Sequence, residues 1–183
     1  SISELLINVW LKNNPLKIGY TPIYMIDFES EYIERANNYH SSGLYKEEFE
    51  ELKKLLDISS DKFSVCCAII EALLYLDSDD ETEKYTELAK SYAKTGYDYF
   101  NLATILTKEP DKYKKHISDA FINSVKLTPE EKLYAHSFLN YTERIHDIEL
   151  SKKAWELLVE HGLNDDDVEK YKHFQKIYKM VKG

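Results

Sequence analysis

Apolar residues recur at spacings of three and four along almost the whole chain, and this periodicity constrains the fold more than any other feature. Such spacing places apolar side chains on one face of an α-helix, whereas a half-buried strand alternates with a period of two. With 5 Gly and 4 Pro in 183 residues, the chain also lacks the turn residues that a β-sandwich or barrel requires. The sequence therefore predicts an all-α fold of about nine or ten antiparallel helices, stacked as helical hairpins with essentially no sheet.

Capping residues, glycines and prolines mark the helix ends. One helix is expected from Asp27 or Ser30 to about Ser42, where Gly43 ends it. Thr128-Pro129-Glu130-Glu131 is typical of a capping box that starts a helix over 129–143. The remaining predicted helices cover residues 3–12, 45–58, 61–76, 77–95, 98–108, 112–126, 147–161 and 165–181.

The whole chain, 1–183, is predicted to form a single all-helical domain. Its parts are an N-terminal helix plus an irregular segment over 1–28, a helical hairpin stack over 29–163, and a C-terminal capping helix over 164–183. The stretch 13–28 holds two prolines and a glycine, so it forms either a packed loop or a short strand. The segment 61–76 is the most apolar and is expected to be the central helix.

Several classes of protein are excluded by what the sequence lacks. No apolar run approaches the roughly 18 residues that cross a bilayer, and no export signal is recognised. The two cysteines are adjacent, Cys66 and Cys67, a spacing that suits neither a disulfide framework nor a zinc site. We therefore expect a cytoplasmic protein that binds no membrane and has neither a cofactor nor a metal site.

The excess negative charge lies entirely in the first half of the chain. The net charge is -9; residues 1–98 hold 19 acidic and 10 basic residues, whereas residues 99–183 hold 14 of each. Such a surface repels phosphates and attracts basic proteins, so nucleic acid is not expected as a ligand. The alternative interpretation is a solvated surface that keeps the protein soluble.

A partner-binding surface is predicted in the first half of the chain, where acidic residues lie near tyrosines in the sequence. The whole chain has 15 tyrosines. Tyrosine is favoured at protein interfaces, although packing in a half-buried position is the simpler explanation of such residues. Any partner is expected to be a basic protein, and the chain itself a monomer or weak homodimer. The predicted contact residues are Glu47, Glu48, Glu50, Glu51, Asp79, Asp80, Glu81, Tyr85 and Tyr92.

A short pattern recurs once in the first half. Ala36-x-x-Tyr39-x-x-x-Gly43 returns 53 residues later as Ala89-x-x-Tyr92-x-x-x-Gly96. It resembles the small-residue, aromatic and glycine positions in the first helix of a tetratricopeptide repeat, although that family repeats every 34 residues. The resemblance implies stacked helical hairpins with a concave groove that binds peptides or protein surfaces.

One catalytic pattern is present. Arg35 and His40, with four residues between them, match the Arg-x4-His signature of the HEPN superfamily of helical ribonucleases. This resemblance implies a His that acts as general acid or base and an Arg that stabilises phosphorane charge. No phosphate loop, zinc-protease motif or nucleophile elbow accompanies it, so no enzyme is expected and no catalytic residue is assigned.

An acidic, tyrosine-rich, helical protein without an active site has the profile of a bacterial immunity protein. The favoured hypothesis is that it neutralises a basic cognate toxin domain, such as a nuclease, by covering its active site with an acidic surface. The first alternative is a tetratricopeptide-like adaptor or secretion chaperone that binds a peptide. The second is the HEPN-type ribonuclease that uses Arg35 and His40.

Overall fold

The computed structural model describes residues 28–160, which form eight α-helices and contain no strand. This confirms the predicted all-α class. The helices are α2 (Phe28–Ser41), α3 (Tyr45–Ile58), α4 (Lys62–Tyr75), α5 (Asp79–Tyr92), α6 (Gly96–Leu106), α7 (Lys114–Leu127), α8 (Lys132–Arg144) and α9 (Ile148–Glu160). The helix predicted over 3–12 and the capping helix predicted over 165–181 lie outside the described residues. So does the loop or strand predicted over 13–28, except for Phe28, which begins α2.

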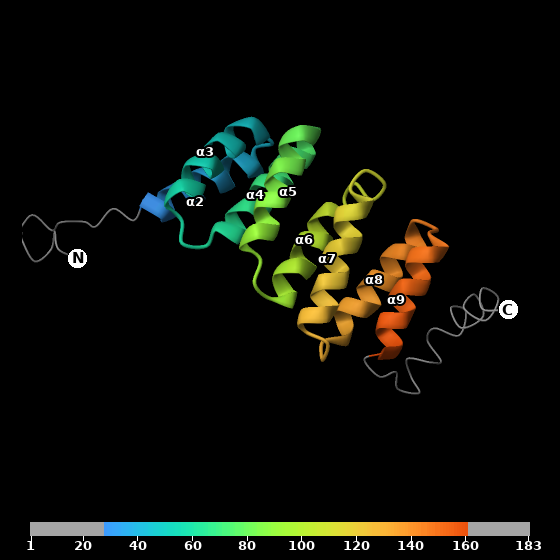
Figure 1. Ribbon diagram of the computed structural model, residues 1–183. Coiled ribbons are helices and arrows are strands. Elements are labelled where there is room, and N and C mark those ends of the chain that lie inside the picture. Colours follow the sequence, from blue (N-terminus) through green and yellow to red (C-terminus); the bar gives the residue numbers. More distant parts are fainter. Residues whose placement is uncertain (1–27, 161–183) are drawn as a thin grey trace, which may run out of the picture.

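Consecutive helices pair as four hairpins, α2/α3, α4/α5, α6/α7 and α8/α9, which follow one another in a single array (Figure 1). The first helices of these hairpins begin at Phe28, Lys62, Gly96 and Lys132, so successive hairpins start 34, 34 and 36 residues apart. A period of 34 residues is that of the tetratricopeptide repeat. The structure therefore carries a repeat of the expected kind, with a shorter period than the sequence pattern indicated.

The two copies of the sequence pattern do not occupy equivalent places in this array. Ala36 lies in α2, the first helix of its hairpin, whereas Ala89 lies in α5, the second helix of the next hairpin. Gly43 follows the end of α2, but Gly96 begins α6. The 53-residue spacing is thus a chance similarity, and the interpretation of it as the structural repeat was wrong.

The turn after α2 is the one that the sequence predicts. Gly43 has φ of +69°, a left-handed conformation that costs glycine little. Its N–H donates to the carbonyl of His40 (3.0 Å), and the N–H of Leu44 donates to the carbonyl of Tyr39 (2.9 Å). These two bonds form a Schellman motif, which closes α2 and turns the chain into α3.

Two other predicted helix ends are corrected. The helix predicted over 77–95 ends at Tyr92, and Thr95 is instead the N-cap of α6, in a reciprocal capping box with Asp98. The capping box predicted at Thr128 is absent because Thr128 ends α7, where its N–H donates to the carbonyl of Ser124 (3.1 Å). α8 begins after Glu131, whose carboxylate accepts from the backbone of Leu133 (3.3 Å).

α4 is the central helix, as its composition predicts. It packs against α3, α5 and α6, so side chains on most of its circumference are removed from water. Burial of each large aliphatic side chain stabilises the fold by about 1.5–3 kcal/mol. The buried residues of α4 are Phe63, Val65, Cys66, Cys67, Ile69, Ile70, Ala72 and Leu73.

Both cysteines are expected to be unreactive in the folded protein. Cys66 and Cys67 are buried free thiols, and burial raises their pKa values to about 11 and about 12. Since the thiolate is the reactive form, a disulfide reagent at pH 8 should label neither residue in native protein and both in urea. Rapid labelling of the native protein would contradict the packing of α4 given above.

Candidate protein-binding surfaces

The acidic residues of α3 divide into two exposed and two buried side chains. Glu47 and Glu50 are exposed, and Glu50 pairs with Lys53 on the same helix (3.1 Å). Glu48 and Glu51 are only 5% and 9% exposed. A partner could reach the first pair directly but not the second pair, so the structure does not present the four predicted contact residues of α3 together.

The buried carboxylates of α3 hold α2 in place. Glu48 Oε2 lies 3.0 Å from His40 Nδ1. Burial raises the pKa of Glu48 above its usual value, and the contact with His40 lowers it by a smaller amount. Glu51 pairs with Lys54 (2.5 Å) and with Arg35 Nε (2.9 Å), and these partners lower its pKa. Both pairs to α2 cross from one helix of the first hairpin to the other.

The two residues of the Arg-x4-His pattern are therefore engaged in contacts within the hairpin. Arg35 pairs with both Glu31 and Glu51, and its guanidinium lies 4.7 Å from the centroid of the Tyr32 ring. His40 contacts Glu48. Phosphate binding by Arg35 would have to compete with two carboxylates, which gives the ribonuclease hypothesis no geometric support.

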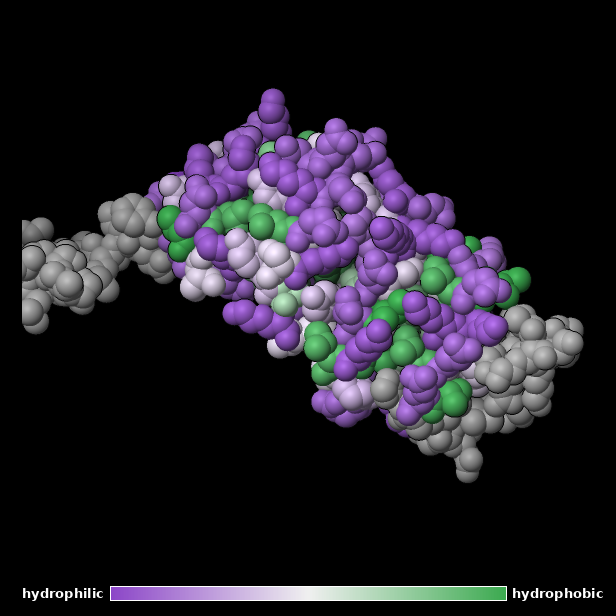
Figure 2. Space-filling model, in the orientation of Figure 1, coloured by the Kyte–Doolittle hydropathy of each residue, from purple (hydrophilic) through white to green (hydrophobic). Residues whose placement is uncertain are grey.

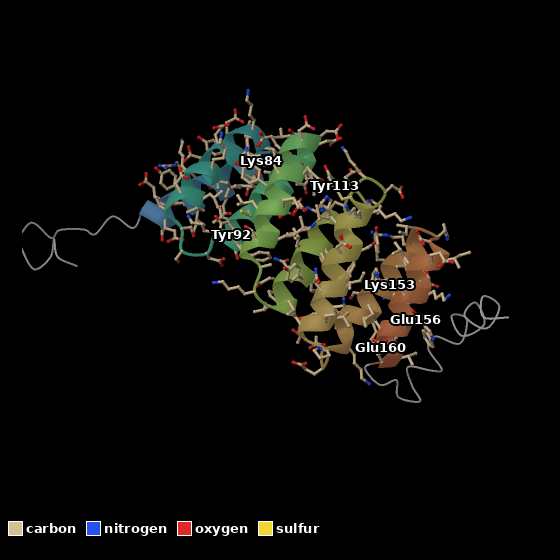
Figure 3. All side chains as sticks on the ribbon, viewed as in Figure 1. Lys84, Tyr92, Tyr113, Lys153, Glu156 and Glu160 are labelled. Carbon is tan, nitrogen blue, oxygen red and sulfur yellow. The ribbon has the colours of Figure 1, made fainter. Side chains whose placement is uncertain are left out.

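The acidic residues at the start of α5 lie in its first turn, where the helix dipole favours them. Asp79 is not free, because it pairs with Lys112 and accepts a hydrogen bond from Tyr113 (3.4 Å). Tyr113 is labelled in Figure 3, at the start of α7 near α5. Asp80 is exposed, and Glu81 pairs with Lys84 of its own helix (3.3 Å).

The two predicted contact tyrosines are packing residues to different degrees. Tyr85 is only 6% exposed and meets Phe49 of α3 edge to face, with ring centroids 5.8 Å apart. Tyr92, at the end of α5 (Figure 3), is half-buried and lines a small hollow with Phe63. Tyr85 thus joins two hairpins, and of the two rings Tyr92 has the larger accessible part.

A groove between α6 and α8 was missed by the sequence analysis. It encloses about 360 Å³ between the first helices of the third and fourth hairpins, with Phe121 of α7 also in its wall. On the face shown in Figure 2, hydrophobic residues reach the surface in stretches over the C-terminal hairpins, among hydrophilic ones. The groove residues are Phe100, Thr104, Thr107, Phe121, Ser137, Asn140, Tyr141 and Arg144.

The groove combines aromatic walls with polar groups at fixed positions. Phe100 stacks on Tyr134 with ring centroids 4.7 Å apart. The hydroxyl of Tyr141 donates to the carbonyl of Pro110 (3.1 Å). These contacts fix the positions of the Phe100 and Tyr141 rings. Arg144 donates to the carbonyl of Thr107 (3.0 Å) across the groove. Asn140 lies one turn before Arg144 on α8, is exposed, and makes no side-chain hydrogen bond within residues 28–160.

Sequence reasoning had little signal for this groove. Its residues come from three helices, and serine, threonine and asparagine at these positions form no motif. The only indication was the general implication of a tetratricopeptide-like array, whose first helices line a shared face. Which residues meet there depends on the helix packing angles.

The helices form pairs that repeat along the chain, and this arrangement defines the fold class. The chain has an all-α helical-repeat fold. Among solved structures it is similar to the tetratricopeptide-like MamA protein, with a TM-score of 0.52 and 11% sequence identity over 85% of this chain and 94% of that chain. At this identity the likeness shows the fold alone. No family model and no curated protein sequence matches the chain.

Within residues 28–160, none of the helices combines the length and the apolar character that a membrane crossing needs.

Proposed function

We propose that this protein is a non-enzymatic adaptor that binds an extended segment of another protein in the groove between α6 and α8. The observation that carries the proposal is the groove itself, formed by the first helices of two successive hairpins in a helical-repeat fold. Such arrays build their binding surfaces from adjacent repeats. A secretion chaperone would use the same mode of binding.

The chemistry of the groove suits a peptide main chain. The Asn140 amide offers both a donor and an acceptor, as a backbone amide requires, and Ser137 lies one turn before it. Phe100 supplies apolar contact for a side chain of the bound segment. Arg144 places a positive charge at the same groove, which favours a segment with an acidic residue.

The toxin-inhibitor hypothesis remains a prediction that the comparisons do not support. It requires an acidic surface open to a basic partner, and Glu48, Glu51 and Asp79 are already paired within the chain. Glu47 and Asp80 are exposed and stay available for it, whereas Glu50 is exposed but pairs with Lys53 of its own helix. We favour the groove because its polar and aromatic groups converge on one concave surface.

Selection of peptides from a random displayed library tests the proposal. Peptides that share a sequence pattern are expected to be enriched, and Asn140→Ala and Arg144→Gln should each weaken their binding by at least about tenfold. Binding is measured by fluorescence anisotropy of the synthetic peptides with purified protein.

The matched control is Asn37→Ala, which removes the same side chain from an exposed position on the first helix of the first hairpin. It should leave peptide affinity unchanged. If binding is lost in Asn37→Ala or in Glu47→Lys but retained in Asn140→Ala, the peptide does not bind in the groove. Binding at the first hairpin, which carries Asn37 and Glu47, would then replace the proposal. The absence of any enriched peptide would also refute the proposal.

A further inference from the structure

A cluster of metal-ligating side chains joins the second hairpin to the third. Glu83 and Glu87 lie one turn apart on α5, and His116 lies on α7. The Nε2 atom of His116 is 2.7 Å from Glu83 Oε1, and its Nδ1 atom is 3.3 Å from Glu87 Oε1. The imidazole is thus held between two carboxylates of another helix, with its side chain only 12% exposed.

A cation already occupies part of this cluster. The ammonium of Lys90 lies 2.8 Å from Glu87 Oε1 and 2.5 Å from His116 Nδ1. The side chain of Lys90 therefore offsets part of the negative charge of the cluster, and it lowers the pKa of Glu87. Because lysine is long and has several rotatable bonds, its head can leave the cluster without a change in the backbone.

The donor set is one that divalent transition metals accept. One ligand atom from each of Glu83, Glu87 and His116 lies within 4.8 Å of the others. Zinc, with bonds of about 2.0–2.2 Å to nitrogen and oxygen, needs its ligands roughly 3.3 Å apart in a tetrahedron, so no pair of these atoms has to close by more than about 1.5 Å. Both glutamate side chains are more than half exposed and are free to make that movement.

We propose that Glu83, Glu87 and His116 bind a divalent transition-metal ion of the zinc class, with water as a fourth ligand. Two carboxylates and one imidazole suit zinc, whereas calcium and magnesium prefer sites made of oxygen alone. The ion replaces the ammonium of Lys90 and links α5 to α7 directly.

The ion would link two hairpins at a place where α5 makes few other contacts with the third hairpin. α5 packs on α4, has only slight contact with α6, and meets the third hairpin through polar pairs such as Asp79 with Lys112. Linking α5 to α7 restricts motion between the second and third hairpins.

Titration of the purified, metal-free protein with Zn²⁺ in competition with a chromophoric chelator tests the site. One equivalent is expected to bind, and Zn²⁺ at a hundred times the Kd should raise the Tm by about 5 °C or more. His116→Gln and Glu87→Gln should each weaken binding by at least about tenfold. Lys90→Met should strengthen it, because the competing cation is removed.

His40→Gln is the matched control, since His40 contacts a single glutamate and should not contribute to a metal site. Melting curves without metal establish that each variant is folded. Equal Zn²⁺ affinity of wild type, His116→Gln and Glu87→Gln would overturn the proposal. Weaker binding in Lys90→Met would also contradict it, because lysine would then be part of the site and not its competitor.

Discussion

Replacing Gly96 with alanine is expected to lower the free energy of unfolding by about 2–3 kcal/mol. A Cβ atom at this position would lie 2.2 Å from Thr128 Oγ1 and 2.7 Å from the carbonyl oxygen of Ser124. The carbonyl belongs to the backbone of α7, so the clash is relieved only by moving α6 away from α7. Urea denaturation of wild type and variant, followed by circular dichroism, measures the difference.

Two variants isolate the steric cause. Gly43→Ala should cost only about 1 kcal/mol, because Gly43 has a positive φ but nothing lies within 4 Å of its added Cβ. Thr128→Gly, combined with Gly96→Ala, should recover part of the loss by removing the nearest side-chain atoms. If Gly96→Ala is no more destabilising than Gly43→Ala, the close approach of α6 and α7 is refuted.

Phe138→Ala is expected to destabilise the protein by about 3–5 kcal/mol. Phe138 is fully buried on α8, and its ring stacks on Phe121 with centroids 5.5 Å apart. Since Phe121 also lines the α6–α8 groove, the cavity left behind should loosen the groove as well. Denaturation measures the stability, and peptide anisotropy in conditions where the variant is folded measures the groove.

Leu133→Ala provides the control on the same helix. Leu133 is 55% exposed, so its truncation should change stability by no more than about 0.5 kcal/mol. Similar losses in both variants would mean that α8 does not pack on α7 through Phe138, and the fourth hairpin would have to be placed differently.

Much of the secondary structure could be predicted because its causes are local. The helix over 45–58 coincides with α3, and Gly43 ends α2 through a left-handed turn. The central place of α4 follows from apolar residues on most of its circumference. In each case the deciding interactions lie within a few turns of helix, so periodicity and capping chemistry are sufficient evidence.

The failures occurred where a local signal had two meanings. Thr95 with Gly96 suggested a helix end, but it is a helix start whose glycine allows α7 to approach. Thr128 and the three residues after it match a capping box, yet Thr128 is the C-cap of α7. The true repeat of 34 residues had no counterpart in a sequence motif, because buried positions in successive hairpins accept many apolar side chains.

Fold class and helix order thus follow from the amino-acid pattern, since both depend on contacts between near neighbours in the chain. Which charges are free was decided by tertiary structure: Glu47 and Glu48 are adjacent in sequence, yet one is exposed and the other buried against His40. The groove brings together residues of α6 and α8 that are 30 to 44 positions apart, and His116 lies 33 and 29 positions from Glu83 and Glu87. Their geometry depends on how hairpins pack, and packing is set by side-chain shape over long sequence separations, which no local pattern encodes.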